Sequence, residues 1–156
     1  MAIKIGINGF GRIGRVVLRI LAEQPDKYEV CGINLRNADL DYMVYQVKYD
    51  SVFRTFRDTV EHDDRHLIIN GKKIRVYSES DITQIPWDDC GAEYIIESTG
   101  AFSTVEKASR HFKGGAKKVL LTAPAKDEVT PTFVYGVNSE LYQPDMMVVS
   151  NASCTT

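Results

Sequence analysis

The sequence is short of cysteine, of net charge and of long apolar runs, and each shortage excludes a class of protein. Its three cysteines, Cys31, Cys90 and Cys154, are odd in number and include no CxxC pair. This pattern argues against a disulfide framework and a cysteine zinc site, and it suits a reducing cytosol. A net charge of −2 over 156 residues gives no electrostatic reason to expect nucleic acid or an anionic membrane as a partner.

Targeting and metal-binding signals are also lacking. The start, MAIKIGING, has no signal-peptide pattern, and no apolar run approaches the length of a membrane span. His62 and His66 are spaced like metal ligands on a helix, but they lead into a predicted hairpin, so we expect solvated loop residues and no metal site. Hydrophobic residues (44%) and charged residues (26%) are present in ordinary proportions. We therefore predict a cytoplasmic globular protein with one core.

The apolar pattern alternates between strand and helix periods along the chain. Strands are predicted at 3–7, 30–33, 94–96, 119–121, 132–137 and 147–149, and helices at 12–24, 40–47 and 104–112. Asn70-Gly71, between two alternating runs, favours a tight hairpin turn. The first strand, helix and strand form a βαβ unit with a right-handed crossover. These features predict an α/β fold, Rossmann-like and doubly wound, with a mostly parallel sheet and an inserted antiparallel hairpin.

The segment NGFGRIGR lies between the first predicted strand and its helix. Gly9, Gly11 and Gly14 have the G-x-G-x-x-G spacing, and Asn8 precedes them. The first glycine allows a tight turn, the second lets a pyrophosphate approach the backbone, and the third lets helix and strand pack closely. Free amides at the helix start then face the anion. A glycine-rich turn without a ligand is the alternative, and the context favours dinucleotide binding.

The second predicted strand ends with GINLRNAD, which departs from the usual dinucleotide pattern. An acidic residue commonly holds the adenosine ribose at this point, but here Asn34 is followed by Leu35 and Arg36. Leu35 does not repel a 2′-phosphate as a carboxylate would, and Arg36 is suited to pair with one. Alternatively, Leu35 only packs and Arg36 points into water. NAD and NADP therefore stay equally open as cofactors.

The chain ends with VVSNASCTT, directly after a predicted strand. Ser153 is a suitable N-cap, which would place Cys154 in the first turn of a helix, where the amides and the dipole lower the pKa of a thiol. A nucleophile and a buried cysteine both stay possible on this spacing alone. Cys31 is simplest as a small buried residue within a strand, and Cys90 has no visible partner. His111, near a predicted helix end, is expected at the surface.

Several segments together carry a resemblance to a known family. These are KIGINGFGRIGR, KYDS, INGKKIRV, ESTG, GGAKKVLLTAPAKD and VSNASCTT. In this order, from Ile3 to Thr156, the chain resembles phosphorylating glyceraldehyde-3-phosphate dehydrogenase. The resemblance implies that Cys154 is the nucleophile that attacks glyceraldehyde 3-phosphate, passes hydride to NAD or NADP, and leaves a thioester that inorganic phosphate cleaves. It also implies that Ser153 and Thr155 bind the substrate or the phosphate.

The resemblance also implies a set of cofactor contacts. Arg12 and Ile13 match pyrophosphate contacts, and Leu35 and Ser80 depart from the family, which commonly has aspartate and a basic residue there. The expected cofactor-binding residues are Asn8, Gly9, Gly11, Arg12, Ile13, Gly14, Asn34, Leu35, Arg36, Ser98, Thr99, Gly100 and Thr122. Erythrose-4-phosphate dehydrogenase and a non-catalytic NAD(P)-binding module are the alternative functions.

The resemblance finally implies a domain division. Residues 1–150 are expected to form the NAD(P)-binding domain, and residues 151–156 are expected to begin a catalytic domain. The catalytic histidine of the family and most of its substrate site have no counterpart in the chain, so we expect the chain alone to be inactive. The full-length protein is expected to be a homotetramer.

Overall fold

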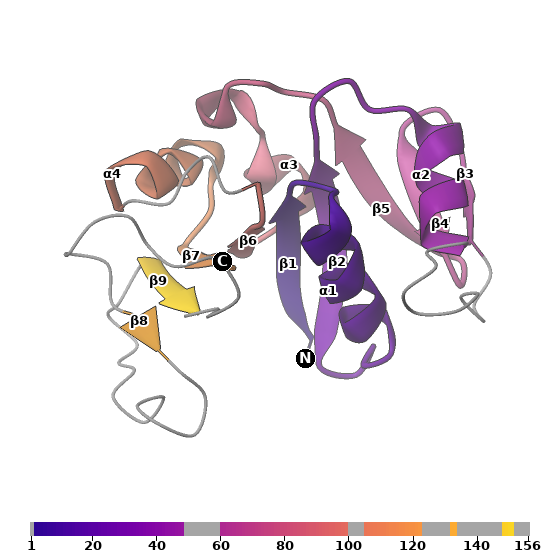
Figure 1. The fold of residues 1–156 in the computed structure, drawn as a ribbon, viewed down its shortest axis with the longest axis horizontal. Helices are drawn as coiled ribbons and strands as arrows, with labels where there is room; N and C mark the ends of the chain where they lie inside the picture. The colour runs from indigo at the N-terminus through magenta and orange to yellow at the C-terminus, as the bar shows by residue number, and fades with distance from the viewer. Residues whose placement is uncertain (1, 49–59, 100–104, 123–131, 134–147, 152–156) are drawn as a thin grey trace.

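The computed structural model describes residues 2–48, 60–99, 105–122, 132–133 and 148–151. Its strands form one sheet in the order β3-β4-β5-β2-β1-β6-β7-β9-β8 (Figure 1). The strands are β1 Ile3–Asn8, β2 Tyr28–Asn34, β3 Val60–His62, β4 His66–Ile69, β5 Lys72–Tyr77, β6 Tyr94–Glu97, β7 Lys118–Leu121, β8 Thr132–Phe133 and β9 Val148–Asn151. The α-helices are α1 Arg12–Ala22, α2 Leu40–Lys48, α3 Trp87–Cys90 and α4 Val105–Ala108, and two 3₁₀-helices are η1 Ile82–Gln84 and η2 Ser109–Gly114.

Strand direction confirms the predicted fold class. β1 pairs in parallel with β2 on one side and with β6 on the other. The parallel pairing continues from β2 to β5 and from β6 through β7 and β9 to β8. Only the pairs β3–β4 and β4–β5 are antiparallel among the described strands. The chain therefore winds from β1 toward both edges of the sheet, with the hairpin inserted at one edge.

The inserted hairpin turns at the predicted dipeptide. Asn70 has a φ of 53° and Gly71 a φ of 79°, the two positive values that a tight type I′ turn requires. His62 and His66 lie on β3 and β4, on either side of the preceding turn, and not on a helix. The expectation of loop residues is therefore wrong, because both belong to the antiparallel ribbon, and only His62 is exposed. The predicted antiparallel ribbon is therefore confirmed.

Two apolar cores cover the two faces of the sheet. One contains Leu18 of α1 and Met43 of α2, and the other contains Trp87 of α3. Consecutive residues of β6, Ile95 and Ile96, belong to different cores, as expected because successive strand side chains point to opposite faces. Full burial of each large apolar side chain stabilises the fold by about 1.5–3 kcal/mol, so both faces contribute.

The segment after β6 differs from the prediction. The helix expected at 104–112 is described as four residues of α4 followed by η2. His111 lies in η2 and is 0% exposed, so the expected surface position is wrong. Its ring packs against Trp87, with 6.0 Å between ring centroids. Within the described ranges, no helix combines the length and the apolar character needed to cross a membrane.

Candidate dinucleotide site

A cavity of about 450 Å³ lies where the carboxyl ends of β1, β2 and β6 meet. β2 and β6 flank β1 on opposite sides, so the cavity is at the point where the winding direction of the sheet reverses. In open α/β sheets, this switch point is where ligands bind. The lining residues come from the three strand ends and the segments after them: Asn8, Gly9, Phe10, Gly11, Asn34, Leu35, Arg36, Glu79, Ser80, Ile82, Ser98 and Thr99.

The glycine loop forms one wall of this cavity. Gly9 has a φ of 105°, and a Cβ on Gly14 would lie 2.3 Å from the carbonyl oxygen of Gly9, so only glycine allows this approach of α1 to the loop. A Cβ on Gly11 would meet nothing within 4 Å. Gly11 is the N-cap of α1, and no side chain caps the helix there. The first amides of α1 therefore lack a side-chain partner at the place where an anion would bind.

A buried polar network ties the three strand ends together at the cavity. The Asn34 side-chain amide donates to Asn8 Oδ1 at 2.8 Å, and the Asn8 amide donates to Glu97 Oε1 at 2.7 Å. The backbone N–H of Thr99 donates to Glu97 Oε2 at 3.0 Å, and the Thr99 hydroxyl donates to the same oxygen. Asn8, Asn34 and Glu97 are each at most 3% exposed. Buried polar groups with all partners in place are rigid, so this network holds the cavity wall in one arrangement.

His111 completes the network from the other side of Glu97. The Trp87 indole N–H donates to His111 Nδ1 at 3.1 Å, and His111 Nε2 lies 2.8 Å from Glu97 Oε1. An indole nitrogen can only donate, so Nδ1 is the acceptor and Nε2 carries the proton that is donated to Glu97. Every described partner of the Glu97 carboxyl group is thus a donor, so both of its oxygens act as acceptors.

Ser98 fixes the glycine loop against β6. Its hydroxyl donates to the carbonyl oxygens of Asn8 and Gly9, at 3.0 and 3.2 Å. The Ser98 backbone N–H also donates to the Asn8 carbonyl, at 2.9 Å. From the first turn of α1, the Arg15 side chain donates to the Phe10 carbonyl at 2.9 Å. The loop is therefore held from both the sheet and the helix.

The adenosine end of the cavity contains the two residues that depart from the usual pattern. Leu35 is half-buried against the α1 side of the core, and its backbone N–H donates to the Tyr77 carbonyl at 3.1 Å. Arg36 is exposed, and both residues line the cavity. The Asn34 side chain exchanges hydrogen bonds with the Glu79 backbone, which brings Ser80 to the same wall. Within the described residues that line the cavity, the one carboxylate is that of Glu79.

Other predicted cofactor residues lie near the cavity or outside the description. Arg12 and Ile13 are exposed at the start of α1 but do not line the cavity. Thr122 follows β7, and its hydroxyl donates to the Glu97 carbonyl at 3.2 Å. The remaining predicted residues, Gly100, Ser153, Cys154 and Thr155, lie outside the described residues.

Sequence reasoning missed the lining residues Phe10, Glu79 and Ile82, and it also missed Glu97 and His111 in the network behind the cavity. Glu97 belongs to the ESTG segment, of which only Ser98, Thr99 and Gly100 were expected to matter. An acidic residue directly after the apolar run Tyr94–Ile96 was a usable signal, because it places a carboxylate at the end of a buried strand. For His111 the sequence held no such signal, since its partners are distant in the chain.

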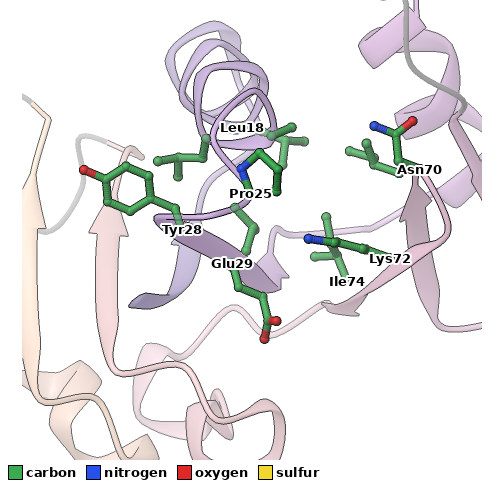
Figure 2. A pocket seen from close by; sticks show the side chains of 11 residues that line it. Leu18, Pro25, Tyr28, Glu29, Asn70, Lys72 and Ile74 are labelled. Carbon is green, nitrogen blue, oxygen red and sulfur yellow. The ribbon is translucent and has the colours of Figure 1, made fainter. Parts of the chain in front are cut away.

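A second cavity, of about 160 Å³, lies between α1, the start of β2 and the β4–β5 hairpin (Figure 2). Leu18, Pro25, Tyr28 and Ile74 give it an apolar wall, and Glu29 and Lys72 are exposed at its rim. It has neither a glycine loop nor an uncapped helix start. This cavity therefore does not fit a dinucleotide.

A metal site is not supported by the described part of the chain. Within it, no group of three or more histidine, cysteine, aspartate and glutamate side chains could hold an ion. His62 and His66 instead bind acidic groups: His62 Nε2 lies 2.6 Å from Asp41 Oδ1, and His66 Nδ1 lies 3.0 Å from Asp63 Oδ1.

Comparison with known proteins gives one consistent family. The family model described as "Glyceraldehyde 3-phosphate dehydrogenase, NAD binding domain" matches residues 3–105. A glyceraldehyde-3-phosphate dehydrogenase of Glossina morsitans morsitans is 58% identical over 153 residues, which cover 98% of this chain and 45% of the relative. A cytosolic one of Gracilaria gracilis is 52% identical over 153 residues, with coverage of 98% and 45%. A chloroplastic one of Arabidopsis thaliana is 54% identical over 154 residues, with coverage of 98% and 36%.

The chain thus spans less than half of the length of these curated relatives. The names of the relatives include two different compartments. The family match covers the glycine loop, the end of β2 and the network residues Asn8, Asn34, Glu97 and Thr99, whereas His111 lies beyond the matched range. The chain therefore belongs to the glyceraldehyde-3-phosphate dehydrogenase family and carries its NAD(P)-binding domain.

Proposed function

We propose that the complete protein is a phosphorylating glyceraldehyde-3-phosphate dehydrogenase, and that the cavity at the ends of β1, β2 and β6 is its NAD(P) site. The observation that carries the proposal is the combination of this cavity with the open glycine loop and the uncapped start of α1. The loop leaves room for a pyrophosphate at Gly11, and the α1 amides supply donors to it. The bound cofactor would act as the hydride acceptor.

The residues of this chain have separate roles in that proposal. The Asn8–Asn34–Glu97 network orients the strand ends, so the cavity does not have to reorganise when the dinucleotide binds. Cys154 attacks the aldehyde carbon of glyceraldehyde 3-phosphate as a thiolate, and inorganic phosphate cleaves the resulting thioester. Ser153 and Thr155 bind the substrate or the phosphate. These last three roles rest on the matched sequence segment.

The test of the activity is a turnover assay on the complete protein. Cys154→Ser should abolish the formation of reduced cofactor from glyceraldehyde 3-phosphate and phosphate while dinucleotide affinity stays unchanged. Normal turnover by this variant would contradict the assignment of the nucleophile. A parallel assay with erythrose 4-phosphate decides between the two aldehydes, because a higher kcat/KM for erythrose 4-phosphate would make the protein an erythrose-4-phosphate dehydrogenase.

We further propose that the site accepts NADP as well as NAD, because Leu35 brings no negative charge to the adenosine end and Arg36 is exposed beside it. We also propose a cytoplasmic location, which the name of the cytosolic relative supports, and a homotetramer, which the family relationship supports. Sedimentation equilibrium of the complete protein tests the tetramer, and a monomer would contradict it.

A further inference from the structure

Cys31 occupies an irregular position in β2. The β1–β2 register passes from Ile5 opposite Val30 to Gly6 opposite Gly32, so Cys31 is an extra residue without a partner on β1. Such a bulge changes the direction of the side chains around it. Cys31 belongs to the core on the α3 side, and a Cβ on Gly32 would also point toward α3, at 3.2 Å from the Trp87 ring. The bulge thus turns two consecutive positions of β2 toward α3.

Cys90, the last residue of α3, lies directly against this part of β2. Its sulfur would be 2.7 Å from a Cβ on Gly32, so there is space for it only because residue 32 is glycine. Cys90 also packs against the core that contains Cys31, where the Cys31 thiol donates to the Ile5 carbonyl at 3.6 Å and the Cys90 thiol donates to the Trp87 carbonyl at 3.5 Å. Cys90, for which no partner was visible in the sequence, thus has a neighbouring thiol in the fold. Two thiols that are 59 positions apart in the sequence are neighbours in the fold.

The two thiols have unequal environments. The neighbouring Cys31 thiol and the nearby Ala92 backbone N–H lower the pKa of Cys90 to about 7. The neighbouring Cys90 thiol and burial raise the pKa of Cys31. Cys90 is half-buried, whereas Cys31 is buried. The pair thus combines a half-buried thiol at Cys90, which a small oxidant can reach, with a buried thiol at Cys31 behind it. This is the arrangement of a nucleophilic and a resolving cysteine.

We propose that Cys31 and Cys90 form a redox-active dithiol, which a peroxide converts into an intramolecular disulfide between β2 and α3. The Cys90 thiolate attacks one peroxide oxygen, the O–O bond breaks, and the released hydroxide takes a proton to leave as water. Cys31 sulfur then attacks the sulfenic sulfur of Cys90, and the hydroxyl group leaves as a second water with the Cys31 proton. The peroxide is reduced to two waters, and each sulfur is oxidised by one electron.

The disulfide would link β2, which contributes to the cofactor cavity, to α3, which does not. β2 ends at Asn34, which lines the cavity, and α3 does not contribute to the lining. A thiol reductant reverses the link, which is how disulfides in a reducing compartment commonly serve as sensors. The dithiol is separate from Cys154, and its chemistry does not depend on the proposed dehydrogenase activity.

The sequence makes the test direct, because trypsin separates the three cysteines. Cys31 falls in peptide 28–36, Cys90 in peptide 76–107 and Cys154 in peptide 127–156. The purified 156-residue chain, dilute enough to suppress intermolecular contact, is treated with hydrogen peroxide, alkylated and digested without reductant. Mass spectrometry should find peptides 28–36 and 76–107 linked with the loss of two hydrogens, and dithiothreitol should restore both free thiols. The same link should form in Cys154→Ser.

Two results would overturn the proposal. One is a wild-type digest in which Cys31 stays free while Cys90 or Cys154 is oxidised. The other is a digest in which the links that form contain Cys154. The matched variant Cys31→Ser should lose the link and leave Cys90 as a sulfenic acid that dimedone traps. Since the decisive measurement uses the wild-type chain, a folding defect in this variant does not change the outcome of the test.

Discussion

The two ends of the parallel strands β1 and β2 differ in chemistry. At the carboxyl ends, polar side chains and the glycine loop line a cavity of about 450 Å³ together with the apolar side chains of Phe10, Leu35 and Ile82. At the start of β2, apolar side chains surround a cavity of about 160 Å³. Strand β2 contributes residues to both cavities. The difference therefore comes from local features: the glycine loop, the uncapped helix start and the buried carboxylate of Glu97 are all at the carboxyl ends.

The comparison shows why the larger cavity suits a ligand and the smaller one suits packing. Burying a carboxylate is costly unless donors surround it, and Glu97 is retained at 3% exposure with donors from Asn8, Thr99 and His111. The polar groups at the rim of the smaller cavity, Glu29 and Lys72, are exposed to water and need no such arrangement. Substitutions should therefore affect dinucleotide binding strongly at one end and weakly at the other.

Gly14→Ala should have the largest effect. Its new Cβ would meet the Gly9 carbonyl oxygen at 2.3 Å, so α1 must move away from the loop, at a cost of about 1–3 kcal/mol in the free energy of unfolding. Dinucleotide affinity should fall as well. Gly11→Ala is the matched control, because its Cβ meets no atom within 4 Å. Urea unfolding should show a smaller loss of stability for Gly11→Ala than for Gly14→Ala, because alanine is a poorer N-cap than glycine but meets no clash there. Calorimetry should show weaker binding for both variants, and equal stability of the two variants would contradict the packing role of Gly14.

Glu97→Gln should have the next largest effect. The new amide group presents a donor to at least one of the donors that now face Glu97, which leaves a buried polar group unpaired at a cost of about 1–3 kcal/mol. Thermal unfolding and cofactor titration should both show a loss. Glu29→Gln, which makes the same chemical change at the rim of the smaller cavity, should stay within about 0.5 kcal/mol of wild type. A similar loss of stability and cofactor affinity in Glu97→Gln and Glu29→Gln would contradict the proposed difference between the two cavities.

Leu35→Asp should change cofactor preference without a large change in stability. The carboxylate repels a 2′-phosphate and accepts from ribose hydroxyls, so the affinity ratio of NAD to NADP should rise by about tenfold, which is about 1.4 kcal/mol. Leu35→Asn, of nearly the same shape but without charge, is the control. An equal ratio in wild type and Leu35→Asp would mean that Leu35 is not at the adenosine end.

The smallest effect is expected at His62, on the inserted hairpin. Hydrogen bonds to the Asp63 backbone and to the Asp41 carboxylate raise the pKa of His62 above its usual value of 6.5. A raised pKa means that protonation favours the folded state: this contribution is complete below about 6.5 and is lost as the pH rises through the folded pKa. An NMR titration should show the raised pKa, and Asp41→Asn should lower it. If the pKa of His62 is the same in wild type and in Asp41→Asn, the hydrogen bond to Asp41 does not raise it.

The sequence predicted what depends on local periodicity and turn chemistry. The alternation of β1, α1 and β2, the glycine loop and the Asn70-Gly71 turn are each encoded within a few consecutive residues. The contacts that complete the site are not local. Asn8 and Glu97 are 89 positions apart, and Trp87 and His111 are 24 apart. No period or motif links such residues, so His111 was assigned to the surface and Cys90 was left without a partner.

The β2 bulge is a further feature that a periodic pattern cannot predict. A regular strand would place Cys31 and Gly32 on opposite faces, and the alternation of burial gives no warning of an extra residue. Only the pairing of β1 with β2 reveals it. The dithiol therefore depends on register, which is set by tertiary contacts.

An amide NMR titration of this chain with NAD and NADP tests most directly where the dinucleotide binds. If the carboxyl-end cavity is the dinucleotide site, the resonances of Gly9, Gly11, Ser98 and Thr99 should shift with the added cofactor. Those of Leu18, Val30 and Ile74, around the smaller cavity, should stay in place. Shifts confined to the second group, or no shifts at saturating cofactor, would contradict the assignment of the site.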